Sequence, residues 1–318
     1  MAQPNSMETV VRTLACAGSS GETRVFCTWG ADDHAAPDVD ATPNGRRGFS
    51  SLVARLKSFA PDLIEHHQQV KQALCVQRAL PDAAHLLYRH NALRPPHGII
   101  DRWRYDDRYR RLDGLVFVSA AARLGFIEAF PHWAHKAFSV PNPIDARFWI
   151  ASPLDRDPLI AFAGRPLPEK GLDLICAALP AVLEAHPDWR AVLMLNDWDK
   201  HAAWARAQLA PLEPYSDRIE ILKSAPLAQE QEKMRRAAIA QTPSVWDEPF
   251  GLTAVEAHAA GAALITSGRG GLSEASGPHA LYLDQLTPQA LTLAMLQLIE
   301  DPVWRLALAE AAQAHVLA

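Results

Sequence analysis

Short apolar runs rich in β-branched and aromatic residues alternate along this chain with longer segments in which apolar residues recur at helical spacing. The runs lie at residues 23–29, 85–91, 115–119, 138–141, 159–164, 190–195, 219–224, 239–244, 262–268 and 280–284. Strands of a parallel sheet covered on both faces have this near-continuous apolar character, and the intervening segments are long enough for crossover helices. The alternation predicts an α/β protein built from doubly wound parallel sheets.

The length of the chain and one irregular stretch predict two domains. The chain has 318 residues, about twice the ~150 residues of an average domain. Prolines and charges at 141–145 and 151–158 interrupt the alternation near its middle. We expect two Rossmann-like domains, over residues 1–150 and 151–318, facing each other across a cleft. Such sheets bind ligands at the carboxyl ends of their strands, so the chemistry should lie in the strand-to-helix loops.

Composition and charge exclude several classes of protein. A net charge of −5 gives no reason to expect nucleic acid as a partner. Four cysteines without a Cys-x-x-Cys pair predict neither a disulfide framework nor a structural zinc, and they indicate a reducing cytoplasm. The first residues do not resemble a signal peptide, and no apolar run approaches the ~18 residues of a membrane span.

Two cations flank the loop that follows the predicted strand 159–164. Arg165 and Lys170 lie between Gly164 and Gly171, just before apolar residues at helical spacing. Because a helix N-terminus attracts anions, two added cations favour binding of a diphosphate and would compensate the charge of a departing one. A solvated arginine and a lysine at a helix start are common, so this loop alone is weak support.

The most specific motif spans residues 243–261. A strand ends near its start, a loop carries Glu248, and a helix from about Leu252 carries Glu256, so that two carboxylates stand eight residues apart. Amides around Gly251 can receive phosphate oxygens, Glu256 can accept paired ribose hydroxyls, and Glu248 can face a sugar ring. A third loop, at 267–274, contains the pair Gly270-Gly271, whose lack of side chains permits backbone contact. The layout fits a nucleotide sugar.

In order and spacing, these three motifs resemble those of the GT-B-fold retaining glycosyltransferases of family 4, the glycosyl transferases group 1. The likeness covers residues 158–305 firmly and 1–150 more loosely, where Pro-Asn-Pro-Ile-Asp at 141–145 is similar to the family's P-N-G-V-D segment. It implies transfer of a sugar from a nucleotide-diphosphate donor to a sugar, lipid-linked or polysaccharide acceptor, with retention of configuration and with no metal or other cofactor.

The resemblance also implies roles for single residues. Arg165 and Lys170 would bind the donor diphosphate, Glu256 the ribose, and Glu248 the donor sugar near its reacting carbon. His90, at the end of the run 85–91, is the candidate for a donor-facing histidine. The expected catalytic residues are therefore Glu248, Lys170, Arg165 and His90, and the expected nucleotide-sugar-binding residues are Gly164, Arg165, Lys170, Glu248, Phe250, Gly251, Leu252, Thr253 and Glu256. His66 and His67 lie in a segment similar to a family strand, and they would either approach the cleft or pack within the domain.

The chain departs from the family pattern at its start. Residues 1–6 are too few and too polar for the expected first strand, and 7–14 already has the pattern of a helix, so we expect the first domain to lack that strand. Two alternatives to a transferase stay open: a non-catalytic nucleotide-sugar-binding protein, and a nucleotide-sugar epimerase of the same fold. Asp197-Trp198-Asp199 has the outline of a metal-binding motif, but we expect a solvent-exposed loop there and predict no metal site.

Residues 101–111 combine five arginines with aromatic residues. Arginines interleaved with aromatics suit the surface of an anionic membrane, which gives a weak peripheral membrane contact at the cytoplasmic face as one interpretation. Three aspartates in the same segment favour the other interpretation, a salt-bridged helix face exposed to water.

Overall fold

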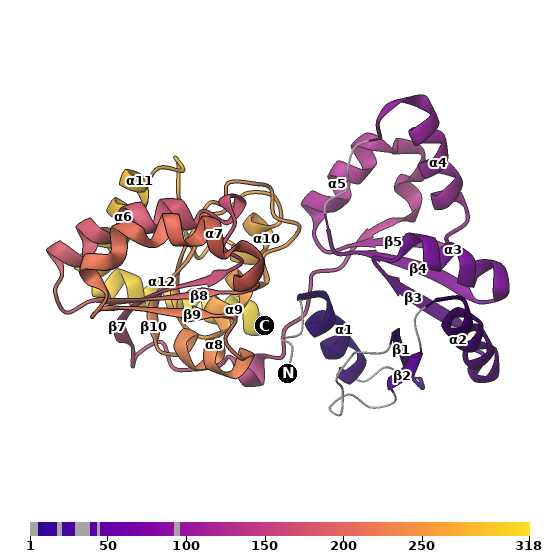
Figure 1. The fold of residues 1–318 in the computed structure, drawn as a ribbon, viewed down its shortest axis with the longest axis horizontal. Helices are drawn as coiled ribbons and strands as arrows, with labels where there is room; N and C mark the ends of the chain where they lie inside the picture. Colours follow the sequence, from indigo (N-terminus) through magenta and orange to yellow (C-terminus); the bar gives the residue numbers. More distant parts are fainter. Residues whose placement is uncertain (1–5, 18–20, 29–38, 43–44, 92–95) are drawn as a thin grey trace. The chain divides into compact units, whose positions relative to one another are not determined.

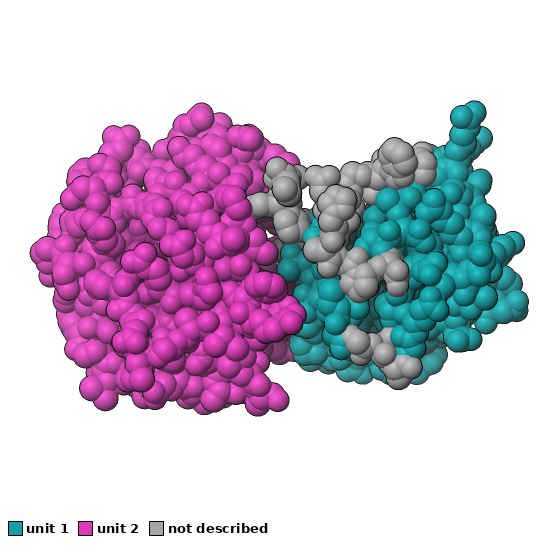
Figure 2. All heavy atoms as spheres, turned by 90° about the horizontal axis from the view of Figure 1, so that it is seen from below, with its two compact units in different colours: residues 1–143 teal, residues 144–318 magenta. Residues whose placement is uncertain are grey.

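The computed structural model describes residues 6–17, 21–28, 39–42, 45–91 and 96–318, which form two compact units (Figures 1 and 2). Unit 1 covers residues 1–143 and unit 2 covers residues 144–318. The division of the chain therefore lies a few residues before the boundary expected at 150, and it leaves the short 3-10 helix Ala146–Phe148 and the buried Trp149 in unit 2. In the described part of the chain, no helix combines the length and the apolar character that crossing a membrane requires.

Unit 2 is built on one parallel sheet with the strand order β12-β11-β10-β7-β8-β9. Its strands are β7 (Asp157–Gly164), β8 (Arg190–Leu195), β9 (Ile219–Lys223), β10 (Ala237–Thr242), β11 (Ala263–Thr266) and β12 (Leu281–Tyr282). The chain winds outward from β7 through β8 to β9, and then returns to place β10 on the other side of β7. The neighbours β7 and β10 therefore mark the point where the winding reverses, which is where sheets of this kind bind their ligands.

Helices cover both faces of this sheet. They are α6 (Leu172–Ala185), α7 (Trp198–Leu209), α8 (Leu227–Met234), α9 (Leu252–Ala259), α10 (Leu272–Ser276), α11 (Pro288–Glu300) and α12 (Pro302–Leu317). Helices α6, α7 and α11 lie on one face, and α8 and α9 on the other (Figure 1). The predicted spacing places Leu172, Ile175 and Leu179 on the inner side of α6, and all three are fully buried in the core of unit 2.

Unit 1 contains two parallel sheets, β1-β2 and β3-β4-β5-β6. Its strands are β1 (Val25–Thr28), β2 (Val39–Thr42), β3 (Leu63–His67), β4 (Ala84–Arg89), β5 (Gly114–Phe117) and β6 (Ala137–Ser139), and its helices are α1 (Ser6–Cys16), α2 (Gly45–Phe59), α3 (Val70–Ala79), α4 (Gly98–Arg110) and α5 (Ala120–Ala129). The predicted helix at 7–14 is part of α1. We expected no strand at residues 1–6. Of these, 1–5 lie outside the described residues and Ser6 begins α1.

An aromatic cluster joins α4 and α5 to the larger sheet of unit 1. Tyr109 of α4 packs edge-on against Phe126 of α5, with ring centroids 5.1 Å apart, and Phe126 contacts Phe117 of β5 at 4.9 Å. All three side chains are fully buried. The cluster fixes which side of α4 faces the interior.

The sheets and the two α/β units confirm the predicted fold class of doubly wound parallel sheets. One strand that the sequence pattern did not predict is β2, whose residues Val-Asp-Ala-Thr contain no apolar run.

Candidate functional site

The loops that follow β7 and β10 are joined by their backbones. The amide of Val245 donates a hydrogen bond of 2.9 Å to the carbonyl oxygen of Glu169. Gly171, with φ of 73°, ends the first loop, and a Cβ there would lie 2.4 Å from the carbonyl oxygen of Pro243. This close approach at a left-handed conformation requires glycine. The two loops are thereby held together at the point where the winding of the sheet reverses.

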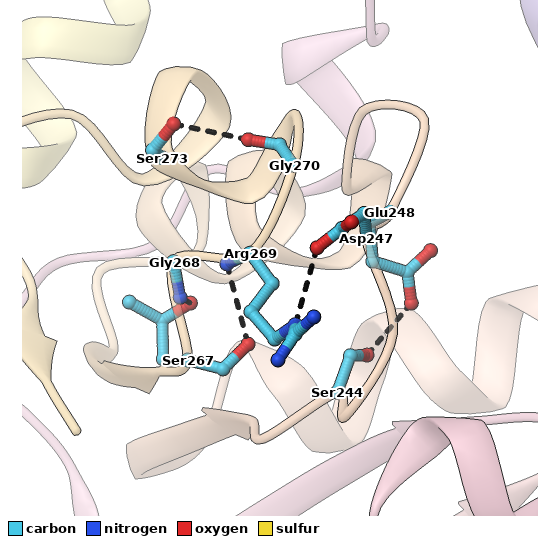
Figure 3. A network of polar contacts seen from close by, with 9 residues as sticks. Ser244, Asp247, Glu248, Ser267, Gly268, Arg269, Gly270 and Ser273 are labelled. Carbon is cyan, nitrogen blue, oxygen red and sulfur yellow. Dashed lines mark hydrogen bonds and ion pairs between the residues drawn. The ribbon is translucent and has the colours of Figure 1, made fainter. Parts of the chain in front are cut away.

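Lys170 and Glu248 meet across these loops. The Nζ atom of Lys170 lies 2.5 Å from Oε1 of Glu248, and the Ser244 hydroxyl donates to the same oxygen at 2.7 Å. Glu248 is buried, and the Lys170 ammonium also lies 5.8 Å from the centroid of the Trp246 ring. Figure 3 shows how Ser244 approaches Glu248. A buried carboxylate with two donors on one oxygen holds both its own position and that of the lysine.

The third loop fixes the backbone of Glu248 from the other side. The amide of Gly271 donates to the carbonyl oxygen of Glu248 at 2.7 Å. Arg269 Nε lies 3.1 Å from Oδ1 of Asp247 (Figure 3). A Cβ on Gly271 would lie 2.4 Å from the carbonyl oxygen of Pro249. The pair Gly270-Gly271 therefore allows the loop at 267–274 to pack closely against the loop that carries Glu248.

The N-terminus of α9 lies directly after this loop. Gly251, with φ of 115°, is its N-cap residue, and no side chain caps the helix. Leu252 and Thr253 form its first turn, so their amides are in position to bind an anion. Phe250 is buried, so its side chain supports the loop and only its backbone is available to a ligand.

Glu256 lies in the second turn of α9 and is partly exposed. Burial of its carboxyl, together with the negative charge of Glu230, raises its pKa to about 8. Glu230, a buried residue of α8, has a pKa that burial raises to about 7, and Nδ2 of Asn196 lies 3.5 Å from its Oε2. Two neighbouring carboxyl groups thus resist ionisation together at this edge of the sheet.

We did not predict Glu230 or Asn196 as residues of the site from the sequence. The α8 sequence Leu-Ala-Gln-Glu-Gln-Glu-Lys-Met contains apolar residues mainly at its ends, so nothing in it distinguishes Glu230 from a solvated glutamate. Asn196 follows directly after β8, and that position is the one signal that could have drawn attention to it.

The expected residues of the first loop differ in their contacts. Gly164 ends β7, and a Cβ there would lie 3.3 Å from the Phe162 ring. The side chain of Arg165 is exposed, and among the described residues no carboxylate lies within 4.0 Å of it. The structure thus brings Lys170 and Glu248 together and leaves Arg165 outside that ion pair.

His90 lies in unit 1, where it pairs with a second histidine. Its Nε2 lies 2.9 Å from Nδ1 of His67, and its backbone amide donates to Oε1 of Gln68 at 3.0 Å. Burial lowers the pKa of both His67 and His90 to about 4, so both rings are neutral at neutral pH. His66 forms a separate buried pair, with its Nε2 2.9 Å from Nδ1 of His85, and packs within the unit.

The segment 197–199 differs from the solvent-exposed loop that we expected. It begins helix α7, whose first residue, Trp198, is buried, while Asp197 pairs with Lys200 at 2.7 Å. In the part of the chain that the structure describes, no three histidine, cysteine, aspartate or glutamate side chains come together as a metal site would require.

A parallel sheet with this strand order binds nucleotides where its winding reverses, and the Lys170–Glu248 pair lies at that point. Two α/β units in one chain, the second with this strand order, share the GT-B architecture of solved glycosyltransferases. The chain belongs to the family described as glycosyl transferases group 1, whose family model matches residues 145–315.

Curated relatives agree with this family. A GDP-mannose-dependent monoacylated alpha-(1-6)-phosphatidylinositol monomannoside mannosyltransferase of Corynebacterium glutamicum is 28% identical over 64% of this chain and 58% of its own length. The lipopolysaccharide core biosynthesis mannosyltransferase LpcC of Rhizobium leguminosarum is 32% identical over 50% of this chain and 46% of its own length. The chain spans 35% to 58% of the length of the first curated relatives that it matches.

Solved structures share the fold. HepE of Anabaena, in complex with UDP and glucose, matches with a TM-score of 0.71 at 20% identity over 88% of this chain and 81% of that chain. Sucrose-phosphate synthase of Thermosynechococcus elongatus matches with a TM-score of 0.73 at 17% identity over 98% of this chain and 87% of that chain. At these identities the likeness supports the architecture alone.

Proposed function

We propose that this protein transfers a sugar from a nucleoside-diphosphate donor to a carbohydrate or lipid-linked acceptor, with retention of anomeric configuration. The observation that carries the proposal is the buried Glu248, held 2.5 Å from Lys170 beside the uncapped N-terminus of α9. A cation and a helix N-terminus suit a diphosphate, and an adjoining carboxylate suits the sugar attached to it. Membership of the glycosyl transferases group 1 supports the same chemistry.

In the proposed reaction, the bond between the anomeric carbon and the diphosphate oxygen breaks while the acceptor hydroxyl attacks that carbon from the same face. The hydroxyl proton passes to the departing diphosphate oxygen. Lys170 and Arg165 stabilise the negative charge that develops on the leaving diphosphate. Glu248 contacts the sugar near its reacting carbon, where positive charge develops. Glu256 accepts hydrogen bonds from the ribose hydroxyls, and His90 is the donor-facing group of unit 1.

The proposed reaction uses no metal or other cofactor. Two cations and the α9 N-terminus supply the positive charge that a diphosphate leaving group needs. The proposed partners are therefore the nucleotide-sugar donor and the carbohydrate or lipid-linked acceptor, and nucleic acid is not among them.

Thermal unfolding of the whole chain against uridine, guanosine and adenosine diphosphates and their sugar conjugates tests the proposal. The panel includes GDP-mannose, on which the Corynebacterium glutamicum relative depends, and UDP-glucose, with which HepE forms a complex. A ligand at ~100 times its dissociation constant adds about 2.7 kcal/mol to the free energy of unfolding, which raises the unfolding temperature by several degrees. Unchanged unfolding temperatures with every ligand would contradict the proposal.

The two alternatives give different products. A non-catalytic binding protein would show the same stabilisation with no product in the presence of any acceptor. An epimerase would release nucleoside diphosphate and an epimerised sugar without an acceptor. Product analysis by mass spectrometry, with and without acceptor, separates these outcomes from transfer.

Binding of the nucleotide sugar should strengthen as the pH rises toward 8. The ribose hydroxyls need the ionised form of Glu256, whose pKa is about 8 in the unliganded protein, so the binding-competent fraction grows roughly tenfold per pH unit below that value. Calorimetric titration with an intact nucleotide sugar measures this, because its diphosphate does not ionise further in this range. Glu256→Gln should bind more weakly and without the pH dependence. Identical profiles for the two proteins would argue against the ribose role.

A further inference from the structure

Three apolar side chains at the start of α4 project into water. Ile99, Ile100 and Trp103 have 88%, 70% and 68% of their surface exposed, values that stand out for residues of this size. Ile99 and Trp103 lie four residues apart and therefore share one side of the helix, with Ile100 next to them. We call these three residues the α4 apolar face.

The opposite side of α4 is anchored in unit 1. Tyr109 is buried against Phe126, and Tyr105 lies 5.8 Å from Phe130 between ring centroids. Because this anchoring fixes the rotation of the helix about its axis, the α4 apolar face stays outside the core. Figure 1 shows α4 at the surface of unit 1.

The aspartates of the segment are already engaged elsewhere. Asp101 accepts the backbone amide of His97 at 3.0 Å at the start of the helix. Asp106 accepts from Nε1 of Trp133 at 2.9 Å. Asp107 pairs with Arg110 at 2.9 Å and with Arg111 at 2.8 Å. The salt-bridged face that the sequence favoured is therefore confined to the C-terminal end of α4.

The positive charge next to the α4 apolar face is not neutralised in this way. Arg102 and Arg104 flank Trp103 and are exposed, and within the described ranges neither guanidinium lies within 4.0 Å of a carboxylate. Arg102 contacts the Phe130 ring, 5.7 Å from its centroid. Exposed apolar side chains, one of them tryptophan, beside unneutralised arginines match the two parts of an anionic lipid surface.

We propose that the α4 apolar face docks on a membrane surface that contains anionic lipids. Ile99, Ile100 and Trp103 would insert below the headgroups, and Arg102 and Arg104 would bind lipid phosphates at the level of the headgroups. The docking requires no nucleotide or acceptor, so it holds or fails independently of the proposed function.

Co-sedimentation of the whole chain with vesicles, without nucleotide, tests the docking. The wild-type chain should pellet with vesicles of phosphatidylcholine and phosphatidylglycerol, and less with phosphatidylcholine alone or at high salt. The triple variant Ile99→Ser, Ile100→Ser, Trp103→Ser should lower the partition coefficient more than about a hundredfold. Arg102→Gln with Arg104→Gln should lower it about fivefold for each arginine, on the anionic vesicles only.

Matched variants control for the loss of apolar area and of charge elsewhere. Leu293→Ser with Val303→Ser removes exposed apolar residues of unit 2, and Arg46→Gln with Arg47→Gln removes exposed arginines of α2; both should bind vesicles like the wild type. All these side chains are exposed, so the unfolding temperature should not change.

The proposal is overturned if the wild-type chain stays in the supernatant, or if the triple variant pellets as much as the wild type does. It is also overturned if the wild-type chain binds no vesicles but forms a dimer that the triple substitution dissociates. The α4 apolar face would then be a protein interface.

Discussion

Replacing Lys170 with alanine is expected to lower kcat/KM for sugar transfer about a thousandfold. The ammonium lies at the carboxyl edge of the sheet, where its charge would stabilise the departing diphosphate. Its neighbours Glu248 and Ser244 carry no positive charge that could take its place. Lys170→Arg should restore part of the activity, because it restores the charge with a different geometry. Steady-state kinetics with the donor identified by thermal unfolding measures both changes.

The same substitution leaves the buried Glu248 without its cation, so lost activity has to be separated from lost stability. The double variant Lys170→Ala, Glu248→Gln removes the unpaired charge and should recover much of the unfolding temperature but none of the turnover. Lys200→Ala removes the exposed ion pair with Asp197 and is expected to change neither quantity measurably. Near-normal turnover in both Lys170→Ala and Glu248→Gln would contradict the proposed site.

Gly171→Ala should destabilise unit 2 by about 2–5 kcal/mol and weaken nucleotide binding together with it. The residue has φ of 73°, and the added Cβ would lie 2.4 Å from the carbonyl oxygen of Pro243. To relieve the contact, the loop after β7 has to move away from the loop after β10, which separates Lys170 from Glu248. Calorimetric unfolding and titration with the nucleotide sugar measure the two effects.

Gly125→Ala provides the matched control. Gly125 lies inside α5, and its φ is not positive. Apart from the adjoining residues and backbone of its own helix, no described atom lies within 4 Å of the position of its missing Cβ. Alanine there should raise the free energy of unfolding by roughly 0.5–1 kcal/mol. If Gly171→Ala left the unfolding temperature and the affinity for the nucleotide sugar unchanged, the contact between the two loops would not be what positions the site.

The sequence predicted the sheet of unit 2 well because its strands are continuous apolar runs, and the boundaries of β8 agree to the residue. It did not predict β2, where the strand is short and half polar. It placed Lys170 and Glu248 in one site through the family motifs, although the two residues are 78 positions apart. Their direct contact depends on the adjacency of β7 and β10, which the order of the strands along the chain does not reveal.

Other features of the site depend on tertiary packing alone. The raised pKa of Glu230 comes from burial against neighbours contributed by other elements, and no local pattern encodes it. The aspartates of α4 illustrate the same point. Their spacing predicted neutralised arginines, whereas Asp101 and Asp106 bond to a backbone amide and to Trp133 instead.

The histidine pairs of unit 1 and the carboxyl groups of unit 2 respond to pH in opposite directions. His66, His67 and His90 have pKa values of about 4 in the folded chain against 6.5 when unfolded. The unfolded chain therefore binds more protons between these values, and acidification through that window favours opening of unit 1.

Glu230 and Glu256 have pKa values of about 7 and 8 in the folded chain against 4.5 when unfolded. Their folded forms hold protons that the unfolded chain releases, so alkalinisation favours opening of unit 2. Unit 2 also contains one buried histidine with a lowered pKa, His258, whose effect ends above pH 6.5. Acidification thus weakens unit 1 through three histidines and unit 2 through one, whereas alkalinisation weakens unit 2 through two carboxyl groups.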